Sequence, residues 1–429
     1  MMKSPTALSR LISPADVDTF FHDVWGQSDR CFRQSLGRGA ADLLSLEGFE
    51  LIIGTLNRAH EGWLHLARGG LKPLPSDMVD EEGMVDLKKI RAAFAGGETL
   101  YLTKAERVSL PLMRLCRSVE LELAARGVAL RRSVNAHVFL TPPESQGFPA
   151  HRDEHASFVV QLEGSKEWTT YGPAPGQTAA EAGAFRPGGV GPDVLRSMSA
   201  RTHHLQAGDV LYMPEWWPHE ARASSSHSLH VTLRVFPLRW VDLVLELCSD
   251  NPALSGAVPP GLTARPEDLS GPLVSVIRSK EFLESLTSRL GVVARRRAIP
   301  RSLLPEDGLR QALGVDEIHP DTLLVRTEGT ACAVCDAGGD SVIEFSGGGI
   351  RGPAIIRPVF EYVARVMALR PRDLPPVAGG DYDRLGIARA MVRDGLLRVD
   401  DRDPLRREES RDQGSGPPNG VVACVEHPE

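Results

Sequence analysis

Hydrophobic residues change their spacing along the chain, and the changes predict its main parts. In the first 130 residues apolar positions recur at helical spacing, most clearly over Pro111–Arg126 and also over Ser13–Trp25 and Leu87–Phe94. From Asn135 to Phe236 the apolar runs become short, and several alternate with polar residues, which is typical of β-strands. After Trp240 helical spacing returns. The pattern predicts a strand-rich domain with helices before and after it.

The strand-rich part contains short segments separated by turn residues. We expect buried strands at Asn135–Thr141, Ser157–Leu162 and Val210–Met213. The residues Glu163–Ser165 indicate a turn, so we expect the chain to fold back there as a hairpin. The alternating run His227–Phe236 completes the set of strands. Many short strands of this kind favour a jelly-roll arrangement.

Three side chains on these strands have the chemistry of a metal site. His151 and Asp153 form a His-X-Asp pair, and positions i and i+2 of a strand point to the same side. His219 follows the later strand that begins at Val210. Two imidazoles and one carboxylate occupy one face of an octahedral ferrous ion and leave the opposite face open. A bare His-X-Asp is common by chance, but its ordered surroundings favour iron ligation here.

The segments around these residues read GFPAHRDEHASFVVQLEGSKEW, GDVLYMPEWWPHEA and HSLHVTL. They resemble the JmjC/cupin-type ribosomal oxygenases, which depend on Fe(II) and 2-oxoglutarate. The resemblance is dense over Asn135–Trp168 and looser over the rest of the chain. It implies an α+β fold, in which a double-stranded β-helix (jelly-roll/cupin, JmjC-type) catalytic domain precedes a helical dimerisation region and a winged-helix-like C-terminal domain.

The resemblance also implies roles for individual residues. Carried over by position, the three side chains above are the iron ligands. Lys166 stands where the family has a cation that pairs with the distal carboxylate of 2-oxoglutarate, a role that suits a charge-assisted hydrogen bond. Asn135 and Thr232 lie on strands that line the family's cosubstrate pocket. Each of these three also has a simpler interpretation: a solvated lysine, a strand-end polar group and a β-branched strand residue.

Two positions depart from the family's pattern. Arg152 stands between the first two ligands where relatives commonly have Tyr, and Arg234 stands near the cosubstrate where they have a small polar residue. Both changes leave the metal ligands intact and leave the substrate open. Of the other histidines, we expect His155 and His227 to be neighbouring or surface groups, while His230 has the strand parity to orient a ligand.

Length and charge narrow the class of protein. A chain of 429 residues with 42% hydrophobic content can form two or three domains with sizeable cores. Its formal charge of −7 draws it toward neither nucleic acid nor an anionic membrane. We find no apolar signal core and no run long enough to cross a bilayer, so we expect a cytoplasmic enzyme without a membrane partner. The six cysteines are too scattered for a disulfide framework, and Cys332 and Cys335 are expected to lie in a strand.

These patterns predict four regions. We expect a catalytic domain with its helical cover at 1–245, a helical dimerisation region at 246–305, a winged-helix-like domain at 306–400 and a disordered tail at 401–429. The expected helix Tyr382–Asp394 mixes arginines with aspartates and has no basic face, so we expect no direct nucleic-acid binding. The other expected elements are helices at Val241–Cys248, Leu273–Ile277, Lys280–Leu290, Asp307–Leu313 and Arg357–Ala368, and a hairpin within Thr322–Phe345 that turns at Gly338–Asp340.

Three functions follow from this set of features. The resemblance favours an Fe(II)- and 2-oxoglutarate-dependent homodimeric oxygenase that hydroxylates an Arg or His side chain of a ribosomal protein, usually at the β-carbon. A peptide hydroxylase that tailors a ribosomally made natural-product precursor in a bacterium is the alternative with the same chemistry. A non-catalytic cupin/winged-helix regulator is the alternative from another class. We find no catalytic Ser-His-Asp set, phosphate-binding glycine loop or zinc-protease motif that favours a different reaction.

Overall fold

The computed structural model describes residues 6–173, 188–249, 251, 254, 256, 266–299, 308–327, 330, 332–346, 348–377 and 383–400. The chain divides into two compact units, Met1–Leu304 and Pro305–Glu429. The tail 401–429 lies outside the described residues, so its disorder stays a prediction. Across the part that the structure describes, the helices lack the length and apolar character needed to cross a bilayer.

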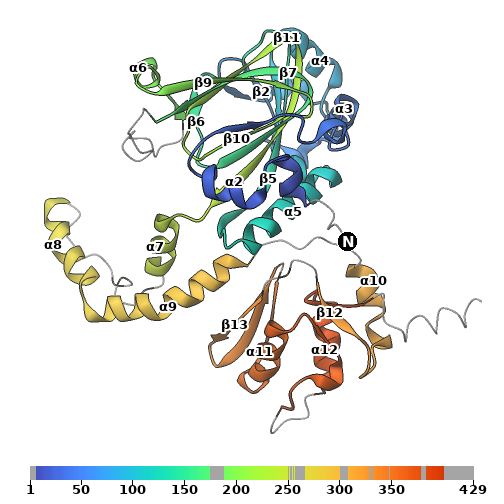
Figure 1. Ribbon diagram of the computed structural model, residues 1–429, viewed down its shortest axis with the longest axis vertical. Helices are drawn as coiled ribbons and strands as arrows, with labels where there is room; N and C mark the ends of the chain where they lie inside the picture. Colours follow the sequence, from blue (N-terminus) through green and yellow to red (C-terminus); the bar gives the residue numbers. More distant parts are fainter. Residues whose placement is uncertain are drawn as a thin grey trace, which may run out of the picture. The chain divides into compact units, whose positions relative to one another are not determined.

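The N-terminal helices of the first unit alternate along the chain with the first strands of its sheet (Figure 1). The helices expected at Leu87–Phe94 and Pro111–Arg126 are confirmed to within one residue at each end. The helix expected at Ser13–Trp25 is shorter, because Asp16 caps its start by accepting from the backbone N–H groups of the first turn. The helices are α1 (Ala7–Leu11), α2 (Val17–Asp23), α3 (Leu46–Thr55), α4 (Leu87–Ala95) and α5 (Leu110–Ala125).

An antiparallel sheet forms the centre of this unit, and its topology fits the predicted double-stranded β-helix. Strand order along the main path is β1-β10-β7-β11-β5-β4-β2-β3, with β6 pairing with β11 and β8, and β9 with β7. The main core lies between this sheet and the N-terminal helices. The strands are β1 (Arg30–Phe32), β2 (Leu64–Ala67), β3 (Leu71–Pro73), β4 (Thr99–Leu102), β5 (Leu130–Thr141), β6 (His151–Arg152), β7 (Ala156–Gly172), β8 (Gly188–Gly189), β9 (Ser199–Gln206), β10 (Val210–Met213) and β11 (His219–Pro237).

The prediction of a hairpin at Glu163–Ser165 is wrong, because the chain continues there as the single long strand β7. Gly164 pairs with Ser228 of β11, and the register between the two strands shifts on both sides of this pair. A side chain at Gly164 would collide with the carbonyl oxygen of His227, and its φ of +67° suits glycine. The glycine therefore marks a β-bulge rather than a chain reversal.

The register shifts decide which side chains face the interior of the barrel. On β7, Ser157 and Val159 line the interior before the bulge, whereas Lys166 and Trp168 line it afterwards. The inward positions thus change from odd to even numbers along one strand. A regular strand would have kept a single parity, and Lys166 would then have pointed away from the interior.

Three helices follow the sheet: α7 (Trp240–Ser249), α8 (Pro266–Ile277) and α9 (Lys280–Ala298). Helix α9 was expected to end near Gly291 but continues through it, because an interior glycine costs a helix only about 1 kcal/mol. All three expose large apolar side chains, among them Trp240, Leu245, Leu273, Ile277 and Leu283. A short further helix, α6 (Pro192–Arg196), precedes β9.

In its described residues, the second unit contains small antiparallel sheets and the α-helices given below. Strands β13 and β14 form the expected hairpin, with Gly338 and Gly339 at positive φ in its turn, and Cys332 and Cys335 lie in β13 as expected. The helix expected at Arg357–Ala368 ends at Arg365, because Ala368 begins a strand. Tyr382, the first residue of the helix expected at Tyr382–Asp394, lies outside the described residues. The elements are α10 (Gly308–Leu313), α11 (Arg357–Arg365), α12 (Arg384–Arg393), a sheet of β16 (Ala368–Leu369), β12 (Leu324–Arg326) and β17 (Leu397–Val399), and a sheet of β13 (Cys332–Ala337), β14 (Asp340–Phe345) and β15 (Gly348–Pro353).

Candidate metal centre

The three predicted metal ligands converge at one end of the barrel interior. His151 on β6 lies directly across the strands from His219, the first residue of β11, and Asp153 follows β6. The Oδ2 atom of Asp153 is 3.9 Å from Nε2 of His151 and 3.7 Å from Nε2 of His219. Ligand atoms of the three residues all lie within 4.8 Å of one another. Ligand atoms about 2.1 Å from one octahedral metal ion lie roughly 3.0 Å apart on one face, so the three side chains must draw together by about 1 Å to bind it.

Hydrogen bonds to the backbone orient both imidazoles for metal binding. Nδ1 of His151 donates to the carbonyl of Pro149, and Nδ1 of His219 donates to the carbonyl of Trp217, each over 2.9 Å. Because a carbonyl only accepts, each Nδ1 carries a proton, and in the neutral form of either ring the lone pair is on Nε2. Burial lowers the pKa of His219 to about 4, so its ring is neutral at pH 7. Both backbone contacts therefore orient the Nε2 atoms of the two rings toward the predicted metal site.

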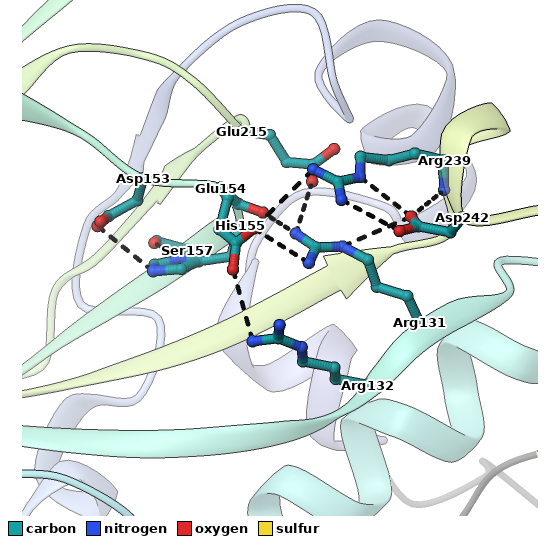
Figure 2. Close-up of polar contacts among 9 residues, drawn as sticks. All are labelled: Arg131, Arg132, Asp153, Glu154, His155, Ser157, Glu215, Arg239 and Asp242. Atoms are coloured by element: carbon teal, nitrogen blue, oxygen red, sulfur yellow. Dashed lines mark hydrogen bonds and ion pairs between the residues drawn. The ribbon is translucent and has the colours of Figure 1, made fainter. Parts of the chain in front are cut away.

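The carboxylate of Asp153 is ionised at neutral pH. Burial acts to raise its pKa, but the nearby imidazoles of His155, His219 and His151 outweigh burial, and its pKa falls to about 2. Nε2 of His155 lies 3.3 Å from Asp153 Oδ2, and Nδ1 of the same ring is hydrogen-bonded to Ser157 (Figure 2). His155 is thus a neighbouring group that orients the ligand, as expected from the sequence.

A charged cluster, here called the Glu154 cluster, holds the backbone beside Asp153. Glu154 points away from its neighbour Asp153 toward Arg131, which pairs with its carboxylate at 3.2 Å and also donates to its carbonyl (Figure 2). On the other side, the backbone N–H of Trp216 donates to the carbonyl of Asp153 over 2.8 Å. Both contacts restrict the loop that carries the ligand. The cluster comprises Arg131, Arg132, Glu154, Glu215, Arg239 and Asp242.

A cavity of about 200 Å³ extends from the three ligands into the barrel and reaches Lys166. Only 5% of Lys166 is exposed, and its Nζ donates to Oγ1 of Thr141 over 2.9 Å. Burial lowers the pKa of this amine to about 7. Within the described ranges Lys166 has no carboxylate partner, which is unusual for a buried lysine. An anion that entered the cavity would supply the missing charge.

The other two predicted cosubstrate contacts lie in different places. Thr232 lines the cavity, from an inward position of β11. Asn135 lies on β5 opposite Arg234, outside the set of residues that line the cavity, and its Oδ1 atom is buried with no hydrogen-bond partner in the described part of the chain. Arg152 is also absent from the cavity lining, whereas Arg234 belongs to it.

Several cavity residues were missed by sequence reasoning. Phe139 stacks on His230 with ring centroids 4.8 Å apart, and Tyr101 stacks on Phe139 with ring centroids 4.5 Å apart. His137 lies between Tyr101 and Arg234 and is hydrogen-bonded to both. The signal that was available is strand parity: 137, 139 and 141 alternate on β5 with the same inward sense. Tyr101 comes from β4, which the sequence did not assign to the site.

Comparisons with known proteins agree with this geometry. Residues 118–243 match the JmjC domain family model. A Drosophila persimilis protein named bifunctional lysine-specific demethylase and histidyl-hydroxylase NO66 is 29% identical over 231 residues, which cover 53% of this chain and 31% of that protein. The protein of the same name from Drosophila mojavensis is 39% identical over 119 residues, covering 27% and 13%. The chain thus matches a third or less of the length of these two relatives.

A solved structure of YcfD, a ribosomal oxygenase from Escherichia coli, in complex with cobalt and 2-oxoglutarate has 14% sequence identity and a TM-score of 0.44, covering 90% of this chain and 98% of that one. A structural similarity this low supports no statement about the reaction of the present chain. The match over 118–243 contains all three ligands, Lys166, Thr232 and Arg234. Residues 118–243 therefore match the JmjC domain, in agreement with the resemblance noted in the sequence.

Proposed function

We propose that this protein is an Fe(II)- and 2-oxoglutarate-dependent oxygenase that hydroxylates a side chain of a ribosomal protein. One observation carries the proposal: a facial set of metal ligands and an unpaired, buried ammonium group lie at the two ends of one cavity. 2-Oxoglutarate needs both features, because one of its ends chelates a metal and the other is a carboxylate.

The donor set fits ferrous iron. His151, Asp153 and His219 supply two neutral nitrogens and one anionic oxygen, the ligand types of non-haem Fe(II) oxygenases, and their ligand atoms border the cavity. When bound, iron and 2-oxoglutarate together supply the oxidising power for hydroxylation of an unactivated C–H bond. The protein's part is to hold the ligands, orient the substrate and exclude water.

Lys166 is the group that would bind the distal carboxylate. In the unliganded cavity burial brings its pKa to about 7, and a carboxylate beside it would favour the charged ammonium. Thr141 fixes the position of its Nζ atom. Thr232 on the cavity wall and Asn135 at the neighbouring strand are proposed to contact the cosubstrate as well. The apolar side chains of Phe139, Trp168 and Met213 also line the cavity and restrict water.

The substrate is proposed to be an Arg or His side chain, hydroxylated at the β-carbon. The name of the Drosophila relatives, which includes histidyl-hydroxylase, supports this class. A peptide precursor of a bacterial natural product is the second candidate, since Arg152 and Arg234 depart from the family's pattern. Mass spectrometry separates the two, because a ribosomal substrate from a deletion strain lacks the mass of one oxygen atom that its counterpart from the parent strain carries.

We further propose a homodimer formed through α7–α9. The exposed apolar side chains of these helices support it, since contiguous exposed apolar surface marks an interaction site. For the second unit we propose a winged-helix-like domain that does not bind nucleic acid directly, and for the protein a cytoplasmic location. Sedimentation of the purified protein with and without Leu245→Glu tests the dimer: the variant should sediment as a monomer.

The central experiment measures succinate formation. Purified protein, Fe(II), 2-oxoglutarate and ribosomal proteins from a deletion strain should yield succinate and a matching gain of one oxygen atom on one protein. Asp153→Asn should abolish both products, whereas His227→Gln, which removes an imidazole outside the cavity lining, should retain them. Tight binding of 2-oxoglutarate without succinate formation, on ribosomal proteins and on peptide libraries alike, would favour the non-catalytic regulator instead.

A further inference from the structure

Arg234 places a second cation on the wall of the cavity, apart from Lys166. It occupies an inward position of β11, opposite Ser157 of β7, and is half-buried. Its Nη1 donates to Nε2 of His137 over 2.9 Å, and its guanidinium also lies over the ring of Phe236. Guanidinium groups offer only donors, so His137 must accept in this contact.

That acceptance fixes the direction of the next hydrogen bond. Burial holds the pKa of His137 well below its usual value, so the ring is neutral and carries one proton. Because Nε2 accepts from Arg234, the proton lies on Nδ1 and is donated to the hydroxyl oxygen of Tyr101. The hydroxyl proton of Tyr101 is then left over. Burial raises the pKa of Tyr101 to about 12, so this proton is retained at neutral pH.

The chain Arg234–His137–Tyr101 therefore presents donors to the cavity. Tyr101 and Arg234 both line it, and over the described ranges neither has a further hydrogen-bond acceptor to satisfy its remaining N–H or O–H groups. A molecule in the cavity must supply those acceptors, since unsatisfied donors in a confined site weaken binding.

The charges of the cavity lead to the same requirement. Among its described lining residues, Asp153 alone carries a carboxylate, and this carboxylate faces the metal site. Lys166 and Arg234 carry positive charge. The charges of a ferrous ion and of the 2-oxoglutarate dianion cancel each other, so the filled site keeps a net positive charge. No described lining residue is left to pair with a cationic side chain.

We infer that the side chain hydroxylated here is a hydrogen-bond acceptor without positive charge, and therefore histidine rather than arginine. The inference rests on the proposed function and narrows its substrate class. A neutral imidazole accepts one of the free donors through a ring nitrogen. A guanidinium offers only donors and would meet Arg234 with the same charge, in a confined space where such repulsion is poorly screened.

Peptide binding tests this without turnover. The protein is loaded with Mn(II) and N-oxalylglycine, an inert analogue of 2-oxoglutarate, and immobilised. Two peptide libraries with the same random flanking residues, one with His and one with Arg fixed at the centre, are passed over it and the retained peptides are quantified. We expect at least about tenfold more of the His-centred library to be retained. Equal retention at any level, or preference for the Arg-centred library, overturns the inference.

Variants assign the preference to the proposed residues. Arg234→Gln removes the charge and should reduce the His-to-Arg retention ratio at least about fivefold, mainly through better retention of Arg-centred peptides. Tyr101→Phe removes only the hydroxyl and should lower retention of His-centred peptides. Arg222→Gln is the matched control, since Arg222 is exposed on the same strand and lies outside the cavity lining, and it should leave the ratio unchanged. An unchanged ratio in Arg234→Gln contradicts the assignment.

A separate measurement distinguishes this inference from the proposed function. Binding of 2-oxoglutarate to the Mn(II)-loaded protein, followed by calorimetry, reports on the metal site and the cosubstrate contacts without involving the peptide. If 2-oxoglutarate does not bind, the proposed function fails. If it binds normally and Arg-centred peptides are preferred, the proposed function stands and the inference about histidine is wrong. The same binding measurement shows that each variant is folded.

Discussion

The Glu154 cluster and the cavity both place charged groups inside the protein, but they balance those charges differently. Every member of the cluster has a partner of opposite charge within 3.9 Å, and its three arginines match three carboxylates. In the cavity, Lys166 and Arg234 are both basic groups, and Asp153 is the one carboxylate among the described lining residues. Burial raises the pKa of Glu215 to about 7, but every group of the cluster still lies beside a partner within the protein, whereas the two basic groups of the cavity lack a carboxylate partner.

This difference separates groups that hold the structure from groups that bind a ligand. A buried charge without a partner costs stability, so a protein keeps one mainly where a ligand completes it. The Glu154 cluster lies one residue from Asp153 and fixes the loop, and its balance means that it needs no ligand. The cavity has the opposite balance, and its missing negative charge matches a carboxylate.

The largest effect is expected where the metal site itself is broken. Asp153→Asn keeps the size of the side chain but removes the anionic ligand. Loss of groups that merely support a ligand costs metal affinity roughly 10- to 100-fold, so loss of the ligand should lower affinity and activity by more than about 100-fold. Calorimetric titration with Mn(II) and succinate release measure the two effects. Metal affinity within threefold of the unchanged protein would contradict the assignment of Asp153.

Lys166→Met should separate stability from function in the cavity. A charge-assisted hydrogen bond contributes about 1.5–3 kcal/mol, so the KM for 2-oxoglutarate should rise roughly 10- to 150-fold. The apo protein should meanwhile become more stable, because methionine fills a similar space without a buried amine. Lys72→Met, at an exposed ion pair with Glu98, is the matched control and should change neither quantity much. A less stable Lys166→Met with normal KM would make Lys166 a structural residue.

The same lysine makes the stability of the apo protein depend on pH. The folded pKa of about 7 is below the ordinary lysine value of 10.5, so between these values the unfolded chain binds more protons at this group. Stability from this group therefore rises with pH over that window, and its penalty is fully present below pH 7. Thr141 contacts the amine and His230 lies near it, but His230 is held neutral throughout because burial lowers its pKa well below the usual range. The stability advantage of Lys166→Met should shrink from pH 7 to pH 10.

Glu154→Gln should disturb the balanced cluster with a smaller effect. The change leaves Arg131, which is buried, without its nearest carboxylate, and we expect unfolding free energy to fall by about 1–3 kcal/mol. Metal affinity should fall about 10-fold, because the loop beside Asp153 loses an anchor. Glu163→Gln removes a half-exposed pair with His227 and serves as control. Chemical denaturation and Mn(II) titration give the two values; unchanged metal affinity would mean that the cluster stabilises the fold without positioning the ligand.

The sequence predicted the metal ligands because their arrangement is local. His151 and Asp153 are two residues apart, and the strand before His219 is marked by its own apolar run. The amphipathic helix α5 was predictable for the same reason, since its period is visible in one segment.

Features that depend on a partner strand were harder to predict. Gly164 is a turn signal in the sequence, but its pairing with Ser228 makes it a bulge, and only the neighbouring strand distinguishes the two. The chain Arg234–His137–Tyr101 joins residues from three strands, and the Glu154 cluster joins β5 to α7. Sequence periodicity contains no information on such contacts between distant segments. The sequence shows how many charged side chains the protein has, but it does not show which of them line the same cavity and whether their charges cancel there.

The smallest expected effect tests how precisely the unpaired charge must be placed. Thr141→Val keeps the shape of the side chain and removes the hydroxyl that accepts from Lys166, while the charge of the lysine remains. A single hydrogen bond contributes about 0.5–1.5 kcal/mol net, so the affinity for 2-oxoglutarate should fall roughly 2- to 12-fold, less than in Lys166→Met. Thr169→Val, on the other face of β7, is the control. If Thr141→Val weakens binding as much as Lys166→Met, orientation rather than charge dominates, and the contrast between the cavity and the Glu154 cluster would need a different explanation.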